Sequence, residues 1–302
     1  MGYRLGIDIG GTTAKIGVVD ENFKVVKSAA APTKGISADG IIESIAEAAR
    51  PLLREYKVES AGIGSPGRVV RETGIVERCG NLPFNVYPVA GNISRALSLP
   101  ALIDNDANCA LIGERAAGVL TGLQNALIIT LGTGIGGAIL IHGRVYRGHN
   151  NRAGELGHFC MDLNGEECEC GLHGCFEMQA SATALIKLTA QYAAQYPDSL
   201  LAKACGEKIS GRTAFAAARA GCPVADSLLK EYGRRLALGL DSLCYVFQPQ
   251  MIAVSGGISR EGQFLLDYIN PHRVADNPVK TSSLQGEGGL IGAALLGTEY
   301  AV

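Results

Sequence analysis

The chain repeats one pattern that strongly restricts its fold: an apolar strand, a glycine-rich turn and a second apolar strand. The first copy covers residues 3–20, and its turn, DIGGTT, begins at Asp8. The second copy covers residues 126–142, and its turn, LGTGIGG, begins at Leu131. The separation between the copies is far longer than a solenoid repeat. We therefore expect an internal duplication in which each half of the chain opens with a similar hairpin.

Strand and helix patterns alternate around these hairpins, which is typical of the α/β class. Apolar residues at helical spacing cover residues 41–56, where Pro51 is expected to kink or end the helix. A second apolar helix face covers residues 229–247 and precedes a strand at 251–255. A chain of 302 residues fits two domains of ~150 residues each.

Composition excludes several classes of protein. Hydrophobic residues make up 47% of the chain and charged residues 19%, as in folded globular proteins. The net charge of −2 lacks the basic excess of a nucleic-acid-binding domain. Asp8 interrupts the first apolar run and no run of about 18 apolar residues occurs, so we expect no signal peptide or membrane span. Most of the nine cysteines stand singly in apolar stretches, which indicates a reduced, cytoplasmic protein.

The two glycine turns have a chemical interpretation. A backbone without Cβ can approach a ligand closely and direct N–H groups toward it, and Thr12 and Thr13 add hydroxyl donors. Asp8 lies at a strand end, where it suits a water of a hydrated magnesium ion. Two such turns predict that both bind one phosphate chain. The alternative is a tight hairpin whose glycines only supply positive φ.

Two further segments allow a functional or a structural interpretation. Gly256 and Gly257 follow the strand at 251–255, where a ligand in a crevice and a plain turn fit equally well. Asp106 lies between a strand and a helix, and this segment alone favours it as the helix N-cap. The alternative is a general base that accepts the proton of a substrate hydroxyl while Asn105 holds a neighbouring hydroxyl.

Three cysteines, Cys168, Cys170 and Cys175, lie within eight residues. With His158 upstream they supply three thiolates and one imidazole, the closed tetrahedral shell of a structural zinc site. His173 is the competing fourth ligand. Unpaired surface thiols or a disulfide are the alternatives, and a cytosolic chain disfavours both.

Glu155 and Glu177 flank this cysteine loop. They are either ordinary surface charges or acceptors for substrate hydroxyls that a rigid metal loop holds in place. In the second case we expect the nucleotide, on the glycine turns, to lie apart from both carboxylates.

In order and spacing these motifs resemble the ROK family (repressor, open reading frame, kinase), over nearly the whole chain. The motifs are DxGGT at 8–12, NDAN at 105–108, LGTGxGG at 131–137, GELGH at 154–158 and CxCGxxGCxE at 168–177. The resemblance implies an actin-like α/β fold of the hexokinase and ribonuclease H type. Two domains would flank a cleft, with a zinc-binding loop in the second. We expect these domains at 1–117 plus about 287–302 and at 118–286.

The resemblance also implies a role for each candidate residue. Asp106 is the expected catalytic base. The expected sugar contacts are Gly67, Asn81, Asn105, Asp106, Glu155, His158 and Glu177. The expected ATP contacts are Asp8, Gly10, Gly11, Thr12, Thr13, Gly132, Thr133, Gly134, Gly256 and Gly257. The expected ligands of a structural Zn²⁺ are His158, Cys168, Cys170 and Cys175.

The implied activity is transfer of the γ-phosphoryl group of ATP, with Mg²⁺, to the 6-hydroxyl of a hexose. The segments SPG at 65–67 and NLP at 81–83 resemble the family's glucokinases, so glucose is the expected sugar. The segment GRV at 67–69 also resembles its N-acetylmannosamine kinases. N-acetylmannosamine, N-acetylglucosamine, fructose and allose therefore stay as alternatives. Two rival classes also remain: a sugar-sensing regulator without catalysis, and an actin-like filament or chaperone protein. The family suggests a homodimer, with no nucleic-acid or membrane partner for this chain.

Overall fold

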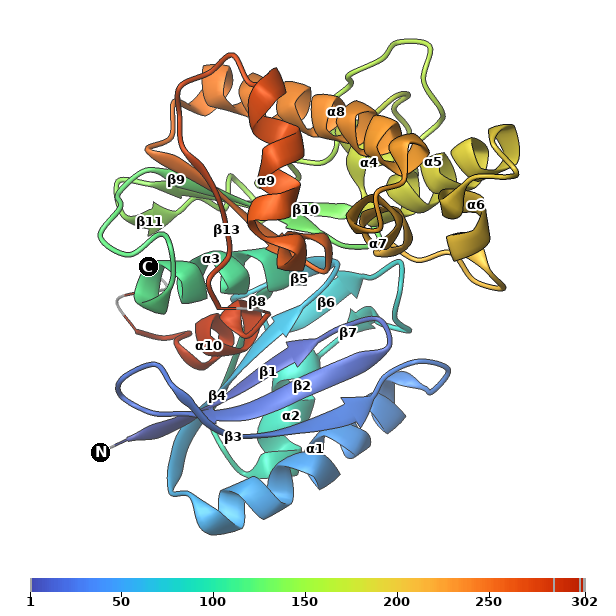
Figure 1. The fold of residues 1–302 in the computed structure, drawn as a ribbon. Coiled ribbons are helices and arrows are strands. Elements are labelled where there is room, and N and C mark those ends of the chain that lie inside the picture. Colours follow the sequence, from blue (N-terminus) through green and yellow to red (C-terminus); the bar gives the residue numbers. More distant parts are fainter. Residues whose placement is uncertain (1, 285, 299, 301–302) are drawn as a thin grey trace. The chain divides into compact units, whose positions relative to one another are not determined.

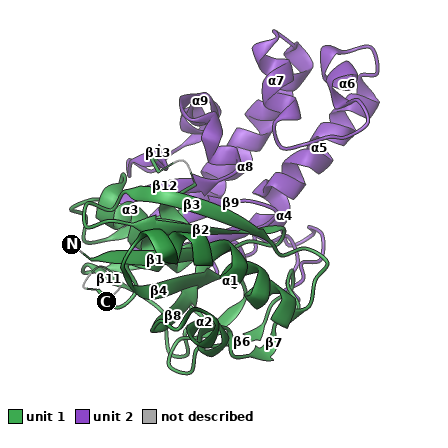
Figure 2. Cartoon of the chain, turned by 90° about the horizontal axis from the view of Figure 1, so that it is seen from below, with its two compact units in different colours: residues 1–128, 138–154, 283–302 green, residues 129–137, 155–282 purple. Residues whose placement is uncertain are grey.

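The computed structural model describes residues 2–284, 286–298 and 300, and its chain forms two compact units (Figure 2). Unit 1 comprises residues 1–128, 138–154 and 283–302, and unit 2 comprises residues 129–137 and 155–282. The first boundary, after residue 128, divides the strand at 126–131 between the two units. The domain limits expected from the sequence, at 117 and about 287, stay a prediction.

A mixed sheet in the order β3-β2-β1-β4-β8 forms the centre of unit 1 (Figure 1). β1, β4 and β8 are parallel, and β1-β2-β3 form an antiparallel meander. In the register Asp8 pairs with Gly64, and Gly64 pairs with Asp104, so the carboxyl ends of the parallel strands share one edge. This edge carries the first glycine turn and the candidate base. The elements are β1 (Tyr3–Ile9), β2 (Thr13–Val19), β3 (Val25–Pro32), α1 (Ala38–Glu55), β4 (Val58–Ser65), β5 (Arg68–Val70), β6 (Ile75–Arg78), β7 (Asn85–Tyr87), α2 (Val89–Leu97), β8 (Ala101–Asn105), α3 (Asp106–Ala117), β11 (Arg144–Val145) and α10 (Gly288–Ala294).

Helices α1 and α2 cover one face of this sheet. The side chains of Leu5, Ile7 and Ile9 are buried, in one core with Ile41 and other apolar residues of α1. Ser37 caps α1 by accepting the N–H of Gly40. Pro51 does not end the helix, which continues to Glu55, because residues 47 and 51 are exposed and water can satisfy the carbonyl that loses its N–H partner.

Helices α3 and α10 cover the other face of the same sheet (Figure 1). α10 contacts the sheet closely because glycines face it. A Cβ added at Gly6 would lie 2.1 Å from the Leu290 carbonyl oxygen, and one at Gly62 would lie 1.7 Å from that of Ala293. The C-terminal segment is therefore an integral part of unit 1.

A second five-stranded sheet has the order β11-β10-β9-β12-β13. Unit 2 adds helices, among which the long α8 packs against α9, α7, α5 and α4. The apolar face expected at 229–247 is buried in α8, as Leu229, Tyr232, Leu236, Leu240 and Leu243 show. The remaining elements are β9 (Ala126–Leu131), β10 (Ile135–Ile141), α4 (Phe176–Ala180), α5 (Ala182–Gln195), α6 (Leu200–Cys205), α7 (Thr213–Arg219), α8 (Pro223–Phe247), β12 (Met251–Gly256), η1 (Ile258–Glu261), α9 (Gln263–Ile269), η2 (Asn270–His272) and β13 (Val279–Thr281). Among the helices of the described chain, none has the length and apolarity to cross a bilayer.

Candidate active site

The first glycine turn connects β1 to β2. Gly10 N–H donates to the Thr13 carbonyl at 3.1 Å, and Thr33 closes the turn by donating from its hydroxyl to the Gly10 carbonyl at 2.6 Å. Neither Gly10 nor Gly11 has positive φ, so the interpretation that these glycines only supply it is wrong. Within the described chain no protein group accepts the N–H of Gly11 or Thr12. These two donors suit phosphate oxygens.

Asp8 lies near the end of β1, just before this turn, and pairs with Lys15 of β2. Burial raises the pKa of the Asp8 carboxyl, and the charge of Lys15 acts in the opposite direction. A partly buried carboxylate gains stability from a cation beside it. The Asp8 carboxylate therefore fits a hydrated Mg²⁺, which binds through few protein oxygens and retains its waters.

The second glycine turn connects β9 to β10. Gly132 N–H donates to the Gly134 carbonyl at 3.0 Å, and neither glycine has positive φ. No described protein group accepts the N–H of Thr133 or Gly134, which matches the first turn. A Cβ at Gly132 would meet no atom within 4 Å, so this residue leaves open space.

The third glycine pair lies beside the second turn. Gly256 ends β12 with φ of 91°, and a Cβ there would lie 2.4 Å from the carbonyl oxygen of Leu131. A glycine at this position is therefore required by the backbone. A Cβ at Gly257 would contact nothing within 4 Å, so this residue is the more open of the two.

The β8–α3 turn carries Asn105 and Asp106. Asn105 is the N-cap of α3, with its side-chain oxygen 2.9 Å from the Ala107 nitrogen, and Asp106 is the first helical residue. The interpretation of Asp106 as the N-cap is therefore wrong. Its carboxylate also accepts the Ala107 N–H at 2.9 Å and is partly exposed at the strand edge.

Gly67 and Asn81 approach this edge from neighbouring loops of unit 1. Asn105 donates from its side-chain amide to the Gly67 carbonyl at 3.5 Å. Gly67 has φ of 88°, and a Cβ there would lie 2.4 Å from the Arg78 carbonyl oxygen. Asn81 lies beside the first turn, since a Cβ on Gly11 would be 3.5 Å from its Cβ. Unit 1 thus gathers all its candidate residues along one sheet edge.

The sequence analysis missed a buried ion cluster beneath this turn. Asp104 is buried, and its Oδ2 accepts from Arg147 Nε at 3.0 Å and Nη2 at 2.8 Å. Arg71 Nε lies 3.1 Å from the same oxygen. The other carboxylate oxygen accepts from the Asn105 N–H and from Asn108 Nδ2, each at 2.8 Å. Asp104 therefore fixes the turn that carries the candidate base.

In unit 2 the loop before α4 brings His158, Cys168, Cys170 and Cys175 together, with one donor atom of each within 4.8 Å of the others. The Sγ atoms of Cys170 and Cys175 are 3.5 Å apart, and Cys168 Sγ is 3.5 Å from His158 Nδ1. A tetrahedral zinc with Zn–S bonds of about 2.3 Å keeps its sulfurs about 3.8 Å apart. The donor set therefore fits zinc. His173 is outside the cluster, with Nδ1 3.3 Å from the Gly165 carbonyl oxygen.

Glu155 and Glu177 take different positions around this loop. Glu155 is exposed, with Oε2 3.9 Å from His158 Nε2. Glu177 instead accepts the Ile135 N–H at 2.7 Å and so reaches the second glycine turn. Glu177 thus contacts a turn that is expected to bind the nucleotide, whereas the expectation that the nucleotide lies apart from both carboxylates stays a prediction.

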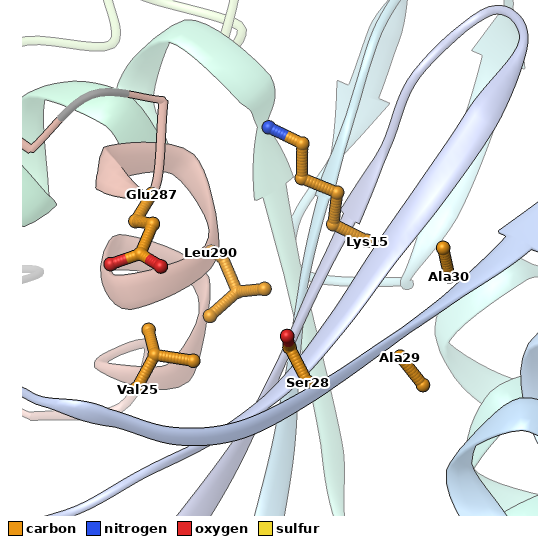
Figure 3. Close-up of a pocket in the computed structure, with 7 residues that line it drawn as sticks. All are labelled: Lys15, Val25, Ser28, Ala29, Ala30, Glu287 and Leu290. Atoms are coloured by element: carbon orange, nitrogen blue, oxygen red, sulfur yellow. The ribbon is translucent and has the colours of Figure 1, made fainter.

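A pocket at β2, β3 and α10 lies elsewhere in unit 1. It has a volume of about 390 Å³, and Figure 3 shows Lys15, Ser28 and Glu287 among the side chains around it. None of the candidate residues from the sequence lines it.

Comparison with known proteins connects these features to a family. Residues 4–299 match the ROK family. A glucokinase of Streptomyces coelicolor is 36% identical, over 99% of this chain and 98% of the relative. A glucokinase of Thermotoga maritima is 34% identical, over 96% of this chain and 95% of the relative. The crystal structure of a ROK family glucokinase from Streptomyces griseus, in complex with glucose and AMPPNP, superimposes with a TM-score of 0.89 at 34% identity, covering 98% of this chain and 99% of that one. These matches confirm the predicted actin-like α/β fold, and the chain belongs to the ROK family.

Proposed function

We propose that this protein is an ATP-dependent hexose kinase that transfers the γ-phosphoryl group of ATP to the 6-hydroxyl of glucose. The observation that carries the proposal is the near-complete match to the Streptomyces griseus glucokinase in complex with glucose and AMPPNP. That relative holds a sugar and an ATP analogue together in the fold that this chain shares.

Each candidate residue has a proposed role in this reaction. Asp106 accepts the proton of the sugar 6-hydroxyl as its oxygen attacks the γ-phosphate. The unpaired N–H groups of the two glycine turns carry the charge of the phosphates, and Gly256 and Gly257 adjoin the nucleoside. The proposed sugar contacts are Gly67, Asn81, Asn105, Glu155, His158 and Glu177.

Two metal ions belong to the proposal. Asp8 would hold a water of the Mg²⁺ that accompanies ATP, and this ion would supply positive charge to the phosphates. Zn²⁺ bound by His158 and the three cysteines supplies rigidity, not reactivity, because four protein ligands leave no open position. His158 presents Nδ1 to Cys168 Sγ, and its Nε2, which lies 3.9 Å from Glu155 Oε2, is the proposed donor to a sugar hydroxyl.

The neighbourhood of Arg68 supports glucose over the N-acetylhexosamines. Arg68 is the residue whose loop resembles N-acetylmannosamine kinases. Its Nη1 lies 3.6 Å from Glu77 Oε2, and Arg152 Nη2 lies 3.2 Å from the same oxygen. In this structure the guanidinium lies beside a carboxylate, whereas recognition of an acetamido carbonyl needs a donor directed at the sugar. A cytoplasmic location and a homodimer complete the proposal.

A coupled phosphorylation assay tests the proposal. Purified protein with ATP and Mg²⁺ is supplied in turn with glucose, mannose, fructose, allose, N-acetylglucosamine and N-acetylmannosamine. We expect kcat/KM to be highest for glucose. A preference for an N-acetylhexosamine would correct the substrate, and sugar binding without turnover of any sugar would favour a regulator.

A further inference from the structure

The second glycine turn is held from one side by residues that follow the cysteine loop. Ile135 N–H donates to Glu177 Oε2 at 2.7 Å. The Gly132 carbonyl accepts the Ala182 N–H at 2.9 Å, and the Thr133 carbonyl accepts the Thr183 hydroxyl at 2.7 Å. Residues 177–183 therefore contact the turn on both sides of its two unpaired N–H groups.

Glu177 makes the only charged contact among these three. A Cβ at Gly134 would lie 2.1 Å from Glu177 Oε2, so the carboxylate occupies the space that a side chain at this position would enter. A hydrogen bond to a charged acceptor is stronger than one between neutral groups. Of the three contacts, Glu177 therefore holds the Gly134–Ile135 peptide most firmly.

The backbone of Glu177 is fixed to the segment that carries the sugar-binding candidates. Its N–H donates to the Gly157 carbonyl at 2.9 Å, next to His158, and Cys175 two residues earlier is the N-cap of α4. Among the described residues no protein donor reaches Glu177 Oε1. That oxygen is left for a substrate hydroxyl while Oε2 holds the turn.

We propose that Glu177 is a positioning residue for the second glycine turn, in addition to its place among the sugar contacts. It orients the Gly134–Ile135 peptide and thereby the neighbouring N–H groups of Thr133 and Gly134 that receive ATP phosphates. The inference rests on the proposed function. A residue that only binds sugar would leave nucleotide affinity in the absence of sugar unchanged, and this separates the two roles.

Calorimetric titration with AMPPNP and Mg²⁺, without sugar, tests the inference on the full chain. Glu177→Ala should raise the Kd for AMPPNP about tenfold, which corresponds to 1.4 kcal/mol. Glu177→Gln should restore most of the affinity, because the amide oxygen still accepts the Ile135 N–H. Glu155→Ala, the matched control, should leave this Kd at its wild-type value. An unchanged Kd in Glu177→Ala overturns the proposal.

Hydrogen exchange at the Ile135 amide gives a readout that does not depend on ligand or activity. Exchange should be faster in Glu177→Ala than in wild type or Glu155→Ala, with the core amides of β9 unchanged in all three proteins. Faster exchange in β9 as well would indicate that Glu177→Ala unfolds generally. In that case Glu177→Gln decides the question, and exchange at its Ile135 amide as slow as in wild type supports the positioning role. Unchanged exchange at Ile135 in Glu177→Ala contradicts it. If wild-type protein phosphorylates no sugar, the proposed function fails while this test of the contact still stands.

Discussion

At the scale of single residues, Asp106 is the position whose chemistry can be separated from its structure. Asn105 caps α3, so Asp106→Asn leaves the cap in place, retains an oxygen that can accept the Ala107 N–H and removes the proton acceptor. We expect kcat to fall by at least ~10², the lower end for loss of a general base, with the Kd for glucose nearly unchanged. Steady-state kinetics and calorimetry measure the two quantities. Near-wild-type kcat would place the base elsewhere.

We expect the charged Asp8 carboxylate to lower the stability of the fold while it serves the binding of Mg²⁺. Burial raises its pKa above the ordinary 3.8, so the folded state retains the proton to higher pH than the unfolded state. The free energy of unfolding therefore falls as pH rises from about 3.8 through the raised pKa. Asp8→Asn removes this loss. Without ATP and Mg²⁺ the Tm of the variant at pH 7 should therefore exceed that of wild type, by roughly 2–4 °C for each kcal/mol by which its free energy of unfolding is higher.

Thermal unfolding as a function of pH measures this difference between Asp8→Asn and wild type. The two Tm values should converge below about pH 3.8, where both side chains are neutral. A variant less stable than wild type at pH 7 would mean that Lys15 and other partners outweigh the cost of burying the charge. Turnover should fall in either case, because an amide holds the Mg²⁺ waters less strongly than a carboxylate.

At the scale of elements, hydrogen bonds of Glu177 in α4 connect the cysteine loop to the second glycine turn. Purified protein should contain about one zinc per chain. Cys170→Ser should lower the zinc content and raise KM for the sugar, and because Cys175 precedes Glu177, KM for ATP should rise as well. Metal analysis and kinetics with each substrate varied check this, with Cys205→Ser in α6 as the matched control. A zinc-free protein with wild-type KM values would contradict the structural role of the metal.

The elements that the sequence predicted are those with a local signal. Apolar strands around glycine turns, the apolar face of α8 and the clustered cysteines all repeat at short spacing, and the structure has each of them. Asp104 and Arg147 are 43 residues apart and pair only because the fold brings them together. The contact between Glu177 and Ile135 spans 42 residues and was missed for the same reason. The roles of the candidate residues in binding and catalysis stay predictions.

At the scale of the whole chain, unit 1 is assembled from three separate segments, and its C-terminal helix α10 seals one face of the sheet. This contact requires Gly62, since a Cβ there would lie 1.7 Å from the Ala293 carbonyl oxygen, a backbone atom that cannot rotate away. Gly62→Ala should therefore displace α10 and lower the free energy of unfolding by about 1–3 kcal/mol, the usual cost of overpacking. Gly91→Ala is the matched control, because a Cβ in that exposed position of α2 meets nothing within 4 Å. Alanine there should raise stability by roughly 0.5–1 kcal/mol through its better helix propensity. Urea unfolding of the three proteins measures both changes. Equal stability of Gly62→Ala and wild type would show that α10 yields at little cost and that the C-terminal segment is not needed to hold unit 1 together.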